Sequence, residues 1–259
     1  MNMRHRTALA AVIGLLIGAT GTLAQEKAPE HVNRIWSFVP RAGVEGEFVK
    51  AFEAHGKWRT EHQDPWHWDI YVEVVGPNVG RRIARSPGHL WSDFDTYETS
   101  DFAAQAADNW NTTVAPFVGN ATSVITRPMT DISNWPDEVP DYHLFQLSFY
   151  RVKIGHITAF RQTARALADT LKQAKWPYPW SFEEWISGGP VPTVLLAIPS
   201  LNWAGLAEPD PNVFEAISGQ VGADKATEMF QAFAATYESI QSVIIQRQPQ
   251  LTVPGAKQP

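Results

Sequence analysis

The chain has 259 residues, of which 44% are hydrophobic, a formal net charge of −6 at pH 7 and no cysteine. A chain of this length can bury a sizeable core without disulfides. The lack of cysteine excludes zinc–thiolate sites, iron–sulfur clusters and a cysteine nucleophile. An acidic chain without a basic stripe is unsuited to nucleic acid and to anionic membranes, so we expect no nucleic-acid partner.

The first 24 residues have the pattern of a secretory signal peptide. Arg4 and Arg6 form a basic start, an apolar run extends from 8 to 17, and small residues at 22–24 suit cleavage before Gln25. The apolar run is too short to span a bilayer stably. We therefore predict a signal peptide at 1–24, a secreted or periplasmic product, and no membrane span after cleavage. The alternative is an uncleaved anchor.

Residues 34–130 predict a first unit with the element order β-α-β-β-α-β. Its helices are predicted from apolar side chains at helical spacing, and its strands from β-branched and aromatic runs that end at turns. The predicted strands are 34–39, 68–75, 79–85 and 123–127, and the predicted helices are 44–62 and 101–114.

A second unit at 142–251 has the same order of elements. It follows an acidic, proline-containing linker at 131–141 and precedes a short tail at 252–259. The predicted strands are 143–151, 181–187, 191–198 and 242–247, and the predicted helical regions are 155–175 and 211–239, the latter interrupted near 219–222.

Rare residue types recur between the two units at one constant offset. Pro65, Trp68, Pro87 and Trp91 are matched 112 residues later by Pro177, Trp180, Pro199 and Trp203. A shared offset over four positions predicts a duplicated unit. Because both Trp pairs recur, we expect packing of each unit to be their main role, with ligand binding as the alternative.

The predicted order of elements is the ferredoxin-like arrangement, whose sheet has helices on one face only. Two such units bury their bare faces by packing them together. We therefore predict an α+β fold of two tandem ferredoxin-like units, packed sheet to sheet about a pseudo-two-fold axis with helices outside. Because the pairing is built into one chain, the protein is expected to be a monomer or a homodimer.

In its order of elements and its Trp-rich blocks at 66–91 and 180–203, the chain resembles the dimeric α/β-barrel superfamily in tandem-repeat form, over 35–251. This superfamily includes antibiotic-biosynthesis-type monooxygenases and NIPSNAP-like, EthD-like and chlorite dismutase-like haem proteins. The resemblance implies that the two units together form a pseudo-two-fold α/β barrel. It also implies a small-molecule-binding protein or enzyme whose aromatic walls hold a planar, apolar ligand while a histidine or glutamate moves a proton. A function inferred from fold alone is associational.

Four histidines distinguish the first unit: His55, His62, His67 and His89. Converging imidazoles would suit a divalent metal or a haem, whereas the alternative is four separate surface or half-buried histidines. Their spacing matches no named metal motif, so we assign no metal ligand. The second unit has proline and leucine at the positions of His67 and His89, so any function of this pair belongs to the first unit.

Carboxylates and arginines on the predicted hairpin are further candidates. Glu73 among aromatic residues suits a general base with a raised pKa, and an ion-paired structural carboxylate is the alternative. Arg85 on the partner strand suits binding of a carboxylate. Among eleven tryptophans, the unpaired Trp66 and Trp185 suit the walls of a ligand pocket.

These arguments predict a pocket between the sheet and the helices of the first unit. The predicted catalytic residues are His67, His89 and Glu73. The predicted ligand-binding residues are His55, His62, Trp66, Trp68, Tyr71, Arg85, Trp91, Trp185, Asn202 and Trp203. We expect no cofactor, with haem or a divalent metal as alternatives. The competing hypothesis is a non-catalytic structural or partner-binding envelope protein.

Overall fold

The computed structural model describes residues 29–256, so the predicted signal peptide at 1–24 lies outside the described residues. The strands are β1 (Val32–Pro40), β2 (Asp69–Val75), β3 (Arg82–His89), β4 (Val118–Pro128), β5 (Leu144–Val152), β6 (Ser181–Ser187), β7 (Thr193–Ser200) and β8 (Tyr237–Arg247). The helices are α1 (Glu45–Glu61), α2 (Trp91–Glu98), α3 (Asp101–Thr113), α4 (Ile157–Gln173), α5 (Val213–Val221) and α6 (Ala223–Ala234). None of the helices in this described part is long and apolar enough to cross a membrane.

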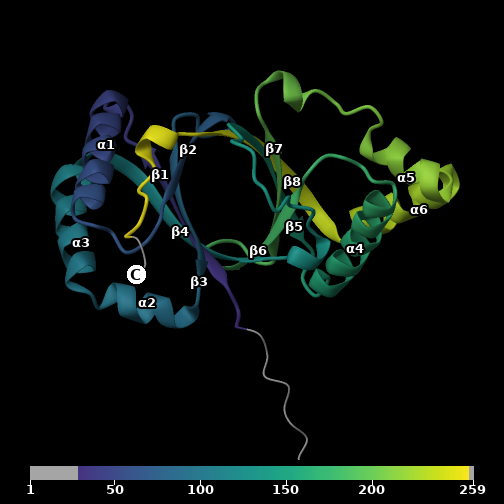
Figure 1. The fold of residues 1–259 in the computed structure, drawn as a ribbon, viewed down its shortest axis with the longest axis horizontal. Helices are drawn as coiled ribbons and strands as arrows, with labels where there is room; N and C mark the ends of the chain where they lie inside the picture. Colours follow the sequence, from purple (N-terminus) through teal and green to yellow (C-terminus); the bar gives the residue numbers. More distant parts are fainter. Residues whose placement is uncertain (1–28, 257–259) are drawn as a thin grey trace, which may run out of the picture.

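The eight strands form one closed antiparallel barrel in the order β1-β3-β2-β8-β5-β7-β6-β4. Within the first half the strands lie in the order β4-β1-β3-β2, and within the second half in the order β8-β5-β7-β6. The pairs β2–β8 and β4–β6 join the halves, which satisfies the backbone groups that an open sheet edge would expose. Figure 1 shows this ring of strands end-on, with the helices on its two outer sides.

An α+β fold with antiparallel strands and external helices is therefore confirmed, but the predicted contact between sheet faces is wrong. The halves meet through hydrogen bonds between strand edges, and their inner faces surround a cavity of about 830 Å³. Closure tilts and spreads the strands, so that the side chains on opposite walls of the barrel do not meet everywhere.

Several element boundaries also differ from the sequence prediction, and β4 and β8 each begin five residues earlier than predicted, at Val118 and Tyr237. Strand β3 continues to His89 through Pro87, which lies beyond the last pairing with β2 and beside an irregularity in the pairing with β1. Proline is tolerated at such a place because no ladder hydrogen bond requires its missing N–H. An additional helix, α2, then precedes α3. In the second half the corresponding two helices are α5 and α6, which meet at Gly222.

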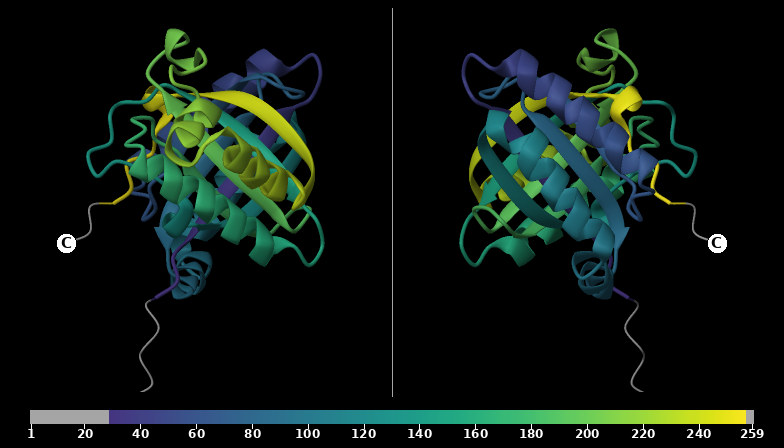
Figure 2. Two further views of the ribbon diagram at one scale, coloured as in Figure 1. Left: turned by 90° about the vertical axis from the view of Figure 1, so that its right-hand side faces the viewer. Right: turned by 90° about the vertical axis from the view of Figure 1, so that its left-hand side faces the viewer.

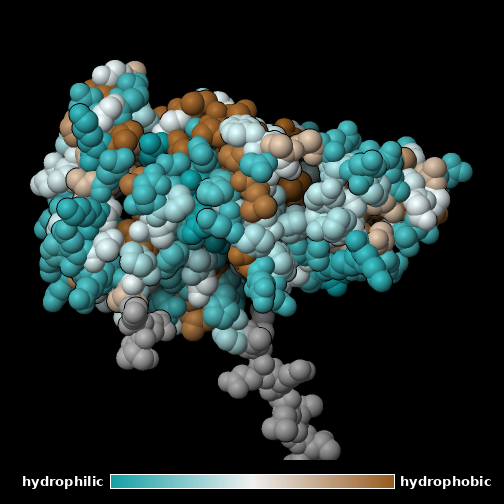
Figure 3. Space-filling view, turned by 45° about the horizontal axis from the view of Figure 1, so that its top comes forward, coloured by the Kyte–Doolittle hydropathy of each residue, from teal (hydrophilic) through white to brown (hydrophobic). Residues whose placement is uncertain are grey.

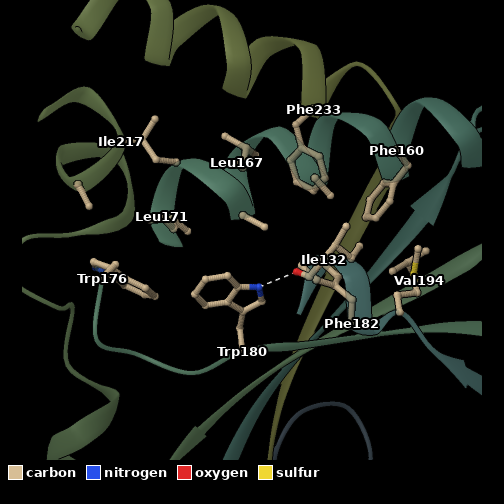
Figure 4. Close-up of a cluster of buried hydrophobic side chains, with 14 of the residues drawn as sticks. Ile132, Phe160, Leu167, Leu171, Trp176, Trp180, Phe182, Val194, Ile217 and Phe233 are labelled. Atoms are coloured by element: carbon tan, nitrogen blue, oxygen red, sulfur yellow. Dashed lines mark hydrogen bonds between the residues drawn. The ribbon is translucent and has the colours of Figure 1, made fainter. Parts of the chain in front are cut away.

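Each half has its own apolar core between its sheet and its helices. In the second half, apolar residues of α4 spaced by three and four face the sheet, as Phe160, Leu167 and Leu171 show in Figure 4. Figure 2 shows that α4, α5 and α6 cover one side of the barrel and that α1, α2 and α3 cover the other. A third cluster lies inside the barrel.

The repeated tryptophans Trp68 and Trp180 occupy matching positions, one residue before β2 and β6. Each is 5% exposed, and each indole nitrogen donates a hydrogen bond, to Asp64 Oδ2 at 3.0 Å and to the Ile132 carbonyl at 2.8 Å. The latter bond is drawn in Figure 4. These two residues therefore pack their halves as predicted.

The second repeated pair does not belong to the core. Trp91 begins α2 and Trp203 follows β7, and they are 45% and 56% exposed. The two residues again hold corresponding places in the order of elements, but both lie at the surface. The prediction that this pair packs the units is wrong.

Replacing Trp180 by phenylalanine is expected to lower the free energy of unfolding by about 1–2 kcal/mol, because the Ile132 carbonyl loses its donor inside an apolar core. The matched change Trp203→Phe is expected to stay within about 0.5 kcal/mol, since this side chain is mostly exposed. Urea unfolding of both variants checks the difference. Equal losses would contradict the assignment of Trp180 to the core.

The segments that follow β4 and β8, the last strand of each predicted unit, pack on opposite halves. At the start of the predicted linker, η2 (Thr130–Ile132) packs on the second half, where Ile132 is fully buried. After β8, η4 (Pro249–Leu251) leads back to the first half, where Val253 pairs with Trp68 and is 2% exposed. The predicted tail is therefore an integral part of the first half as far as residue 256.

Candidate functional site

A cavity of about 340 Å³ lies between the first-half strands β1 to β3 and the helices α1 to α3. Its walls are mostly aromatic and aliphatic: Trp36, Phe38, Phe52, Trp68, Ile70, Trp110, Leu251 and Val253. Polar side chains reach it from the helices, among them His55 and Arg59 of α1 and Tyr97 of α2. This first-half pocket lies where the sequence placed the site, and its volume suits a small ligand.

His55 is the titratable base of this pocket and is 5% exposed. Its Nδ1 donates to Asn109 Oδ1 over 2.7 Å, which leaves Nε2 as the acceptor of the neutral ring. Burial lowers the pKa of His55 to about 4, and the nearby Arg59 charge contributes in the same direction. At neutral pH the imidazole is therefore uncharged, and its low pKa makes it a weak proton acceptor.

Arg59 joins the polar groups of the pocket into one network. It follows His55 by one helical turn, and its Nη1 lies 3.5 Å from His55 Nε2. Its Nε donates to Asp64 Oδ2 at 2.6 Å, and its Nη2 donates to the Tyr97 hydroxyl at 2.5 Å. The guanidinium also lies over the Trp68 ring, 5.1 Å from the centroid. The cation is thereby fixed at the wall of the cavity.

Asp64 holds this network in place from just beyond the end of α1. Gln63 has a φ of 56°, and this left-handed residue ends α1 and turns the chain back toward the helix. Asp64 Oδ1 accepts from the Trp66 backbone at 2.9 Å, and Oδ2 accepts from Trp68 Nε1. Burial raises the pKa of Asp64, although Arg59 and these hydrogen bonds oppose the change.

Tyr97 is a hydrogen-bond donor available to a ligand. Burial raises its pKa to about 12, so the phenol keeps its proton at neutral pH. Because the hydroxyl oxygen accepts from Arg59, its own proton is free to point elsewhere. The pocket therefore presents a neutral base, a phenolic donor and a nearby guanidinium against aromatic walls.

Two of the predicted residues lie behind Tyr97 and support it. Trp66 stacks on Tyr97 with a centroid separation of 4.1 Å and on His89 at 3.8 Å. His89 Nε2 lies 2.7 Å from Ser86 Oγ, and burial lowers the pKa of this histidine. Neither Trp66 nor His89 lines the first-half pocket.

Three others lie on the surface of the first half. His62 stacks on Trp58 and bonds to its carbonyl, His67 lies 3.3 Å from Asp69, and Trp91 is mostly exposed. The four histidines thus do not converge. Among residues 29–256, no group of three or more His, Asp or Glu side chains is arranged to hold a metal ion.

The remaining predicted residues lie in the barrel or in the second half. Tyr71, Arg85 and Trp185 line the barrel cavity. Glu73 is fully buried beside Arg81, with 2.5 Å between Oε2 and Nη2. Asn202 and Trp203 lie in the turn after β7, where Asn202 Oδ1 accepts from the Gly205 backbone. The predicted residues therefore divide among the two cavities, buried positions outside them (Trp66, His89 and Glu73) and the surface.

Sequence reasoning missed Arg59, Asp64, Tyr97, Asn109 and Trp110. The only available signal was the spacing of four residues between His55 and Arg59, which puts both on one face of α1. Asn109 and Trp110 come from α3, far along the chain. No periodicity of that helix indicates that they contact His55.

The chain matches no family model and no curated protein. Several solved structures share its fold. The "putative monooxygenase" of Lactobacillus acidophilus NCFM is 11% identical with a TM-score of 0.52, over 88% of this chain and 97% of that chain. Chlorite dismutase from Candidatus Nitrospira defluvii, in complex with imidazole, is 8% identical with a TM-score of 0.52, over 86% of this chain and 93% of that chain. An anthrone oxidase-like protein is 10% identical with a TM-score of 0.51, over 85% and 92%. The likeness shows that this chain shares the α+β barrel fold of these proteins.

Proposed function

We propose that this protein is a cofactor-independent, monooxygenase-like enzyme that acts on a planar, apolar small molecule in the first-half pocket. The observation that carries the proposal is the neutral, buried His55, whose Nδ1 is fixed by Asn109 and whose ring lines an aromatic cavity. The likeness to monooxygenase-type folds supports the same class of reaction.

The site suits oxidation of a ring system with an acidic C–H bond next to a carbonyl group. His55 Nε2 accepts the proton, and the enolate oxygen accepts a hydrogen bond from Tyr97, close to the Arg59 charge. The electron-rich enolate then reacts with O₂. With anthrone as the probe, one anthrone and one O₂ give one anthraquinone and one water, so no added reductant is required.

Haem does not fit His55. The Arg59 guanidinium lies 3.5 Å from Nε2, so an iron bound to this nitrogen would meet a fixed positive charge. No other histidine lines either cavity within residues 29–256. The residues of the pocket therefore favour chemistry without haem.

Oxygen uptake with anthrone tests the proposal. The His55→Gln variant is expected to lose at least tenfold in rate, because glutamine preserves the bond to Asn109 but removes the base. His62→Gln is the matched control, since His62 lies on the same helix end but outside the pocket. Equal rates in wild type and His55→Gln would contradict the assignment of the base. Tight binding of anthraquinone without any oxygen uptake would instead favour a non-catalytic binding protein.

Two further parts of the proposal concern the evolutionary origin of the fold and the cellular location of the protein. The matching places of Trp68 and Trp180 in the order of elements support a duplication of one ferredoxin-like unit. Export through the predicted signal at 1–24 would place the enzyme in the periplasm or outside the cell. N-terminal sequencing of the mature protein tests this point, with Gln25 expected as its first residue.

A further inference from the structure

The barrel interior forms a second cavity, separate from the first-half pocket. It has a volume of about 830 Å³, within the range of small-molecule sites. Much of its wall is apolar, with Ile83, Leu147, Phe149, Leu195 and Val243 among the lining residues. Figure 3 shows hydrophobic side chains gathered over the middle of the molecule, between the two groups of helices.

The arginines along this cavity are not all paired. Four arginines line it, and three of them have carboxylate partners: Arg81 with Glu73 at 2.5 Å, Arg85 with Glu183 at 2.8 Å, and Arg247 with Asp69 at 3.3 Å and Asp141 at 2.9 Å. The fourth, Arg151, has no acidic partner among residues 29–256. Arg151 is therefore the one arginine of these four without a carboxylate within ion-pair distance among the described residues.

Arg151 faces this cavity from the end of β5. Its cross-strand partners are Thr193 of β7 and Ser239 of β8, and both line the cavity. The Nη1 atom of Arg151 is buried and lacks a hydrogen-bond partner among the described residues. A buried charged donor without a partner is costly, so this nitrogen suits an anionic acceptor.

A second unpaired donor lies at the same level of the barrel. Glu184 of β6 pairs with Val194 of β7, so the next residue, Trp185, lies beside Thr193. Thr193 pairs in turn with Arg151 of β5, so Trp185 and Arg151 lie at the same level of the barrel, about two strand spacings apart. Its Nε1 is buried and also lacks a partner in the described chain. The ring packs edge-on against Phe149 at 5.8 Å. Two donors and an aromatic wall therefore surround one end of the cavity.

We propose that the barrel interior is a binding site for an apolar monocarboxylate. The carboxylate accepts hydrogen bonds from Arg151 and Trp185, and the apolar part lies along Phe149 and Leu195 toward Val243. A single unpaired guanidinium matches a single carboxylate, whereas a dianion such as a phosphate ester would leave excess charge in a poorly solvated cavity. This site is independent of the oxidation proposed for the first-half pocket.

Calorimetric titration of the full chain with decanoate and 2-naphthoate tests the proposal, with decanol and 2-naphthylmethanol as neutral counterparts. At least one carboxylate is expected to bind at least tenfold more tightly than its neutral counterpart. Arg151→Gln is expected to lose at least tenfold in affinity, and Arg151→Lys less. Arg41→Gln is the charge-matched control, since Arg41 is exposed and lies outside the cavity.

Blocking variants locate the ligand. Ala197→Trp places an indole in the barrel cavity and is expected to abolish binding, whereas Ala107→Trp fills the first-half pocket and is expected to leave the affinity unchanged. Circular dichroism verifies that each variant is folded. If Ala197→Trp does not fold, the affinity of Arg151→Gln alone tests the proposal. The proposal is overturned if neither carboxylate binds at 1 mM, if Arg151→Gln binds as wild type does, or if only Ala107→Trp blocks binding.

Discussion

Replacement of Arg85 by alanine is expected to lower the free energy of unfolding by about 3–5 kcal/mol, because it leaves Glu183 charged and unpaired inside the barrel. Arg85 Nη2 and Glu183 Oε1 lie 2.8 Å apart, and Thr126 Oγ1 donates to Oε2 at 2.5 Å. Burial raises the pKa of Glu183, but the Arg85 charge and these hydrogen bonds outweigh it and hold the pKa below its ordinary value. The carboxylate is therefore ionised at neutral pH and depends on its partner.

Urea unfolding at pH 7 measures this loss. The double variant Arg85→Ala with Glu183→Gln is expected to regain part of it, because the second change removes the unpaired charge. Lys225→Ala is the control, since Lys225 pairs with Glu228 on the exposed surface of α6 and contributes less than about 1 kcal/mol. A loss below about 1 kcal/mol in Arg85→Ala would show that water reaches Glu183 and that the pair is not structural.

Lowering the pH from 7 to 4 is expected to remove up to about 3 kcal/mol of stability through His55 alone. The pKa of this histidine is about 4 in the folded protein against an ordinary value of 6.5. Between these two values the unfolded chain binds a proton that the folded protein does not, so stability falls as the pH falls. The contribution is complete above about pH 6.5 and is lost below about pH 4, at about 1.4 kcal/mol for each pKa unit.

The difference between wild type and His55→Gln isolates this contribution from that of other acidic groups. Unfolding free energies of both proteins at several pH values between 4 and 7 are expected to converge as the pH falls, because the glutamine variant lacks the titration. Nuclear magnetic resonance titration of the imidazole gives a second measure. Parallel pH profiles for the two proteins would contradict the lowered pKa.

Local patterns in the sequence predicted the elements well because strands and helices depend on neighbouring residues. The apolar spacing in α4 and the β-branched run of β2 both correspond to real elements. What local patterns could not provide is the closure of the barrel, since the pairings β2–β8 and β4–β6 join residues that lie far apart in sequence. The cavity inside the barrel follows from that closure and was therefore missed.

The side chains of the candidate site also depend on contacts between residues that lie far apart in the sequence. His55 and Trp68 were predicted as ligand-binding residues, and both line the first-half pocket. The four histidines looked alike in the sequence, yet the two buried ones take their partners from distant parts of the chain: Asn109 for His55 and Trp66 for His89. The burial and the partners of a histidine decide whether it acts as a base or stacks on another ring. Both are properties of the folded chain.

The return of the segment after β8 to the first half makes the pocket depend on synthesis of the chain as far as residue 256. Leu251 and Val253 form part of its wall, and the backbone of Ala256 bonds to that of Asp64 at 2.6 Å. During translation, all the helices around the pocket leave the ribosome long before these last residues do. A chain that stops before residue 251 thus carries His55 and Arg59 but lacks part of the wall of the pocket.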